Sequence, residues 1–99
     1  MTGLPENART RPDVGRKEHA MATRSFVLIE TSVGRTKEVV AALKSVREVI
    51  SVDAVTGPYD IIAVVEAHDL NSVGDVVTSK VHVVPGIVRT VTCLAVSLP

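Results

Sequence analysis

The residues from Gly57 to Asp60 interrupt a run of valine and isoleucine with groups that can bind a small polar molecule. Glycine allows close backbone approach, Pro58 stiffens the turn, and Tyr59 and Asp60 leave it with side chains on opposite faces. One interpretation is a hairpin turn and nothing more. The other is a rigid pocket rim for a zwitterion, with Asp60 or carbonyl groups facing an ammonium and amide N–H groups facing a carboxylate.

Two further pairs of polar residues lie on the apolar segments. Thr90 and Thr92 alternate, so they share one face of a strand, and a packing role and a polar role are equally compatible with their type. Glu30 and Glu66 could be neighbours in a sheet and form a carboxylate pair. General acid–base work would require burial that raises their pKa values, so solvent exposure at strand ends is the favoured interpretation.

Cys93 is the only cysteine, which excludes an internal disulfide and a cysteine-based metal or iron–sulfur site. A catalytic thiol needs a positioned base, and the sequence places neither His68 nor His82 beside it. We therefore expect Cys93 to be a buried structural residue and the histidines to have capping or surface roles. The sequence predicts no catalytic residue, no metal site and no cofactor.

The elements that must position these groups follow from the spacing of apolar residues. Strands are indicated over 25–32, 49–56, 59–67 and 87–98, and helices are indicated over about 35–47 and from the predicted cap Asp69 to about residue 81. The order β-α-β-β-α-β predicts an α+β, ferredoxin-like domain, in which a four-stranded antiparallel sheet carries both helices on one face.

The predicted strands are apolar at both odd and even positions, although two helices can cover only one face of the sheet. A sheet face in contact with water would alternate towards polar residues. An identical subunit that packs its own sheet against this face is the simplest cover. The pattern therefore predicts a homodimer that forms through the sheets.

The composition and charge of the chain argue against nucleic-acid-binding and membrane functions. The 99 residues make one small domain that is 45% apolar but only 2% aromatic, which disfavours base stacking of the kind used by RNA-recognition modules. Residues 25–99 carry six basic and eight acidic groups, so they lack the positive field of a nucleic-acid surface. No run approaches the roughly 18 apolar residues of a membrane span, and the N-terminus lacks a signal-peptide core. We expect a cytoplasmic protein with no direct nucleic-acid or membrane partner.

Residues 1–24 mix proline, glycine and both signs of charge without an apolar period. This composition predicts a disordered N-terminal leader. The folded domain is then expected to span residues 25–99.

From Ser25 to the C-terminus the sequence resembles the effector-binding domain of the Lrp/AsnC family of prokaryotic transcription regulators, also called the RAM (regulation of amino acid metabolism) domain. The most specific features are "VISVDAVTGPYD", which leads into the Gly-x-Tyr-Asp turn, and "VPGIVRTVT" at the start of the final strand. The resemblance implies that Gly57, Tyr59 and Asp60 match the family's turn, and that Gly86, Thr90 and Thr92 match its final-strand motif. It leaves open which of these touch a ligand.

The resemblance also implies function and assembly. Domains of this family dimerise through their sheets, commonly build larger rings of dimers such as octamers, and bind amino acids or similar metabolites between dimers. Family transcription factors carry an N-terminal helix-turn-helix, which residues 1–24 do not resemble, so a stand-alone effector domain without DNA binding of its own is expected.

The resulting prediction is a non-enzymatic, oligomeric regulatory module that binds an amino acid through Gly57, Tyr59, Asp60, Thr90 and Thr92. Two alternatives remain open. The first is an interaction module that co-assembles with full-length Lrp/AsnC regulators. The second is a cofactor-free enzyme of the dimeric α+β barrel kind, which would need a polar cleft that holds a histidine or paired carboxylates.

Overall fold

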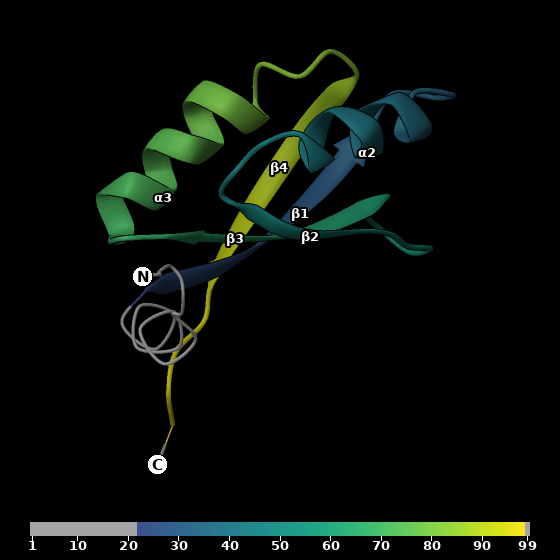
Figure 1. Ribbon diagram of the computed structural model, residues 1–99. Coiled ribbons are helices and arrows are strands. Elements are labelled where there is room, and N and C mark those ends of the chain that lie inside the picture. Colours follow the sequence, from purple (N-terminus) through teal and green to yellow (C-terminus); the bar gives the residue numbers. More distant parts are fainter. Residues whose placement is uncertain (1–21, 99) are drawn as a thin grey trace, which may run out of the picture.

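Strand β1 (Thr23–Thr31) and strand β3 (Ile61–Ala67) form the centre of a sheet because each alternates buried and less buried side chains. The computed structural model describes residues 22–98. Strand β2 (Val49–Ala54) pairs with β3, and strand β4 (Ile87–Leu94) pairs with β1, which gives the antiparallel order β2-β3-β1-β4. Helix α2 (Thr36–Lys44) and helix α3 (Leu70–Val76) with its π-helical extension η1 (Val77–Val81) lie on the same side of the sheet (Figure 1). The predicted ferredoxin-like fold is confirmed.

The core lies between the helices and one face of the sheet. Its buried apolar residues come from β1, β3, α2, α3 and η1: Val27, Ile29, Val39, Leu43, Ile61, Ala63, Val65, Val73, Val76, Val77 and Val81. Full burial of a valine, leucine or isoleucine side chain stabilises the fold by about 1.5–3 kcal/mol. Apart from Ala63, the core of the described residues consists of branched aliphatic side chains and contains no aromatic one.

Several element boundaries differ from the sequence expectation: β2 ends at Ala54 and not at residue 56, and β3 begins at Ile61 and not at residue 59. Helix α2 ends at Lys44 because Ser45 turns its backbone N–H and its hydroxyl to the carbonyl of Ala42. The second helix becomes a π-helix at Val77, and the N–H of His82 donates to the Val77 carbonyl at 2.8 Å. Strand β4 ends at Leu94, after which the N–H of Ala95 donates one further hydrogen bond to the Arg24 carbonyl at 2.9 Å.

The other face of the sheet, here called the open face, is apolar at its centre, and none of the described helices covers it. Alternation and register place these apolar residues on it: Phe26, Leu28, Ile62, Val64, Val91 and Cys93. Phe26 and Val91 are exposed in the single chain. Cys93 is also exposed, so the expectation of a buried cysteine is wrong for the single chain, because the residue faces away from the helices.

The predicted leader, residues 1–24, falls largely outside the described residues. Thr23 and Arg24 are described, and both belong to β1, where they pair with Ala67 and Glu66 of β3. The sheet therefore begins two residues before the predicted domain boundary at residue 25.

Candidate functional site

The turn between β2 and β3 begins at Gly57, whose φ of +139° favours glycine over other residues. No atom lies within 4 Å of the position that a Cβ at Gly57 would take, so the backbone faces open space. Two hydrogen bonds hold the end of the turn: the N–H of Val55 donates to the Asp60 carbonyl, and the N–H of Asp60 donates to the Ile29 carbonyl, each at 2.9 Å. The turn is thus fixed at one end and accessible at the other.

The Asp60 carboxylate binds the chain itself. Its Oδ2 accepts hydrogen bonds from the N–H of Thr31 at 2.8 Å and from the Thr31 hydroxyl at 3.2 Å. The Thr31 hydroxyl also lies 2.7 Å from that of Thr36, in the first turn of α2. Asp60 therefore ties the hairpin turn to the connection between β1 and α2, and one of its two oxygens is already engaged.

Tyr59 faces a charged pair that the sequence did not indicate. The Arg89 guanidinium carbon lies 5.7 Å from the centre of the Tyr59 ring, within the range of a cation–π contact. Arg89 Nε is 3.4 Å from Glu30 Oε1, and the two side chains are 61% and 42% exposed. The three residues, here called the Tyr59 cluster, present a cation, an anion and an aromatic ring at one end of the open face.

The pair of carboxylates that the sequence left open, Glu30 with Glu66, does not form. Glu30 lies opposite Arg89, whereas Glu66 lies opposite Arg24 near the other end of β1 and makes a 2.7 Å ion pair with it. An arginine therefore accompanies each carboxylate. The antiparallel register places the two glutamates near opposite ends of β1. The favoured interpretation, solvent exposure, holds for Glu30 but is wrong for Glu66, whose side chain is only 8% exposed.

Thr90 and Thr92 lie on the helix side of the sheet, opposite to the face that carries Arg89. The Thr90 hydroxyl is 2.6 Å from Nε2 of His82. Thr92 lines a groove of about 300 Å³ between α3 and β4. Among the described residues, neither threonine hydrogen-bonds to the 57–60 turn. The structure therefore joins Tyr59 and Asp60 to residues of β1, α2 and β4, but it does not join them to the two threonines.

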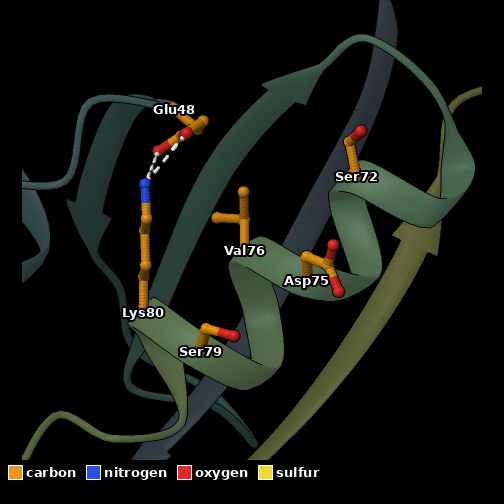
Figure 2. A pocket seen from close by; sticks show the side chains of 6 residues that line it. All are labelled: Glu48, Ser72, Asp75, Val76, Ser79 and Lys80. Atoms are coloured by element: carbon orange, nitrogen blue, oxygen red, sulfur yellow. Dashed lines mark hydrogen bonds and ion pairs between the residues drawn. The ribbon is translucent and has the colours of Figure 1, made fainter.

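A separate polar hollow of about 460 Å³ lies beside α3 and η1 (Figure 2). Lys80 spans its edge and donates to both carboxylate oxygens of Glu48 at 3.0 Å. This hydrogen bond lowers the pKa of Glu48 below its ordinary value. The other polar groups around it, Ser72, Asp75 and Ser79, lie on the same helical segment. The two opposite charges neutralise each other, so this hollow is a weaker candidate than the Tyr59 cluster.

Within residues 22–98, no three histidine, cysteine, aspartate or glutamate side chains gather in a way that could hold a metal ion. None of the described helices is both long enough and apolar enough to cross a membrane.

The four-stranded antiparallel sheet, with both helices on one side and an apolar open face on the other, defines a small ferredoxin-like α+β domain. The family model for the Lrp/AsnC ligand-binding domain matches residues 24–99. The chain belongs to this family, which confirms the resemblance found in its sequence.

Solved structures agree with the family assignment. The protein TTHA0845 from Thermus thermophilus is 35% identical with a TM-score of 0.73, and the match covers 78% of this chain and 96% of that one. AsnC of E. coli is 25% identical with a TM-score of 0.78, and the match covers 93% of this chain but only 62% of that one.

The regulator NMB0573 from Neisseria meningitidis, solved as an L-Met complex, has a TM-score of 0.72 over 95% of this chain and 60% of that one. At 16% identity it shows the fold alone. No curated protein sequence matches the chain.

Proposed function

We propose that this protein is a non-enzymatic regulatory domain that binds an amino acid and responds by changing its assembly. Membership of a ligand-binding family supports this function, and so does the L-Met complex of the structurally similar Neisseria regulator. A ligand can shift an assembly equilibrium only by its difference in affinity for the two states. The single observation that favours a zwitterionic ligand is the Tyr59 cluster.

The Tyr59 cluster matches the charges of an amino acid. Arg89 offers N–H donors to a carboxylate, and Glu30 offers acceptors to an ammonium group. Their separation of 3.4 Å and their exposure make the present ion pair weak, since exposed pairs contribute only about 0–1 kcal/mol. A zwitterion could replace this pair with two charge-assisted contacts at little cost. Gly57 and Tyr59 would form the wall beside it, and Asp60 would hold that wall in place.

The open face supports a homodimer that forms through the sheets. Exposed apolar residues at its centre are flanked by charged residues at its ends, which resembles the arrangement of an interface core and its rim. In such a dimer the Tyr59 cluster would lie at the rim, where a further subunit can complete a site.

The first test is a thermal-denaturation scan of the protein alone and with each proteinogenic amino acid at millimolar concentration. A ligand at about one hundred times its dissociation constant adds roughly 2.7 kcal/mol to the native state and raises the midpoint. Substitution Arg89→Gln removes the cation and should weaken binding by about tenfold or more, since a hydrogen bond to a charged group contributes about 1.5–3 kcal/mol. Lys37→Gln on the exposed surface of α2 is the matched control. A flat scan across all the amino acids would contradict the proposal.

A second candidate function is co-assembly with longer regulators of the same family. The match to E. coli AsnC covers 62% of that chain, so a full-length regulator contains a domain of this kind beside additional sequence. An open face shared by both proteins would allow mixed dimers. Co-purification with such a regulator, together with a flat amino-acid scan, would favour this function over ligand sensing.

A further inference from the structure

Within residues 22–98, the groove between α3 and β4 is lined by residues of both elements and is not filled by any other segment. Helix α3 packs against β3 and β1, so the helix-side face of β4 lies beyond its cover. Leu70, Val77 and Leu94 contribute to the predominantly apolar lining, and Thr92 lies at the floor on β4. The groove measures about 300 Å³, roughly twice the 150 Å³ cavity that holds a benzene molecule. It therefore has room for two branched aliphatic side chains.

Gly74 gives an independent reason to expect a partner at this groove. It lies in the interior of α3 and lines the groove. Glycine at such a position costs about 1 kcal/mol relative to alanine. A Cβ at Gly74 would meet no atom of the described residues within 4 Å, so the packing of residues 22–98 gives no reason for a glycine. Close approach of another segment would supply that reason.

The C-terminal segment 95–98 carries the matching side chains. Leu94, Val96 and Leu98 are 44%, 76% and 84% exposed, and alternation places them on one side of an extended chain. Ala95 is the last residue held by the sheet, through its hydrogen bond to Arg24. From there the chain runs on past the end of β1 and away from α3 (Figure 1). The segment therefore leaves its own groove behind.

We propose that segment 95–98 of a second copy of this chain docks in the α3–β4 groove, with Val96 and Leu98 seated beside Gly74. A second copy is the occupant because each chain offers both the groove and an exposed apolar segment that it cannot fold back into that groove without reversing directly after Ala95. The contact lies on the helix side of the sheet, so it is separate from the open face. Copies can use both surfaces at once.

Cross-linking between two variants tests the contact directly. Both carry Cys93→Ser, which removes the only cysteine; one also carries Gly74→Cys and the other Val96→Cys. A disulfide requires Cα atoms within about 7 Å, so a covalent heterodimer should form upon mixing under mild oxidation. The matched control replaces Gly74→Cys with Lys37→Cys, an exposed position on α2. A heterodimer yield no higher than that of the control would overturn the proposal.

Sedimentation velocity provides a second test without cysteines. Gly74→Leu fills the groove with a better helix former, and a chain that ends at Leu94 lacks the docking segment. Each change alone should raise the dissociation constant of the largest assembly at least tenfold. Mixing the two variants should restore part of the assembly, because one retains the groove and the other retains the segment. Unchanged assembly in both variants, with native circular dichroism, would contradict docking.

Discussion

Asp60 connects three elements of the fold through a single carboxylate. Its carboxylate accepts two hydrogen bonds from Thr31, and through that residue it reaches Thr36 at the start of α2. One carboxylate therefore links the hairpin turn to the end of β1 and, through Thr31, to the first turn of α2. We expect Asp60 to contribute to stability and, through the position of Tyr59, to binding.

Removing this carboxylate should destabilise the fold. For Asp60→Ala we expect the free energy of unfolding in urea to fall by about 1–3 kcal/mol, because the half-buried N–H of Thr31 loses its acceptor. Asp60→Asn keeps one oxygen acceptor and should lose less. Asp53→Ala, at an exposed position on β2, is the control and should change stability by no more than about 0.5 kcal/mol. If Asp53→Ala and Asp60→Ala lowered the free energy of unfolding equally, the stabilising role of the Asp60–Thr31 hydrogen bonds would be contradicted.

Asp69 caps α3 as its sequence position predicts, and Oδ1 accepts from the N–H of Ser72 at 2.8 Å. This hydrogen bond lowers the pKa of Asp69 below its ordinary value. A group whose pKa falls on folding stabilises the protein above its unfolded pKa and loses this contribution as the pH falls through the folded value. We expect the thermal midpoint of the wild type to fall more steeply below about pH 5 than that of Asp69→Asn. Asparagine also caps a helix but does not titrate. If the thermal midpoints of the two proteins changed with pH in parallel, the contribution of the ionised Asp69 cap to stability would be contradicted.

At this scale the sequence predicted the residue types better than their partners. The Gly57–Asp60 turn and the Asp69 cap follow from local preferences, and the structure has both. The link from Asp60 to Thr31 spans 29 residues, and the contact between Arg89 and Tyr59 depends on the register of β1 against β4. A single sequence does not reveal that register. Arg89 directly precedes Thr90 in the matched motif, which is the only signal that could have drawn attention to it.

Among the elements, α2 is seated against the loop that precedes β4. Gly86 has a φ of +100°, and a Cβ there would lie 3.0 Å from both Arg35 Cβ and Val39 Cγ2. The N–H of Ser32 donates to the Gly86 carbonyl at 2.8 Å. The glycine in the family motif at the start of the last strand therefore allows the helix to approach the loop.

Gly86→Ala should destabilise the fold more than a glycine substitution with dihedral strain alone. Gly34, whose φ is +80° and whose surroundings are open, provides the matched control. Gly34→Ala should lower the free energy of unfolding by about 1–2 kcal/mol, the cost of a left-handed alanine. Gly86→Ala should lose a further 1–3 kcal/mol, approximately, because of overpacking against α2. If urea unfolding gave the same loss of unfolding free energy for both variants, close packing of α2 against Gly86 would be contradicted.

The order of the elements was predictable because each helix shows an apolar stripe and each strand is rich in β-branched residues. The π-helical turn at Val77–Val81 was not predictable. Its apolar residues continue the helical spacing, and Val77 and Val81, four residues apart, would share one face of an α-helix as well, so their pattern does not distinguish the two helical forms.

For the whole molecule, the open face determines the expected state in solution. Leu28→Lys on this face should dissociate the proposed dimer and raise its dissociation constant by about 100-fold or more, because an unpaired buried ammonium costs several kcal/mol. The fold of the monomer should persist, since the side chain points away from the core. Val33→Lys, in the exposed loop after β1, is the control. Light scattering of the wild type that finds only monomer at micromolar concentration would contradict the dimer.

The sequence correctly predicted that one face of the sheet is left uncovered in a single chain. Strands that are apolar on both faces, in a domain with only two helices, leave one face uncovered, and the structure has this face. What covers it is not encoded in any local pattern, because the positions of two separate chains depend on the shapes of both surfaces.

The position of Tyr59 against Arg89 has a practical consequence. The chain contains no tryptophan, one tyrosine and one phenylalanine, so with excitation at wavelengths that phenylalanine does not absorb, the intrinsic ultraviolet emission of the untagged protein comes from the Tyr59 ring. A guanidinium 5.7 Å above that ring sets the local environment of the fluorophore. Any molecule that draws Arg89 away, or any subunit that covers the turn, will therefore change the intensity or lifetime of light from a single known residue. The protein carries its own optical reporter at the place where we expect it to sense its ligand.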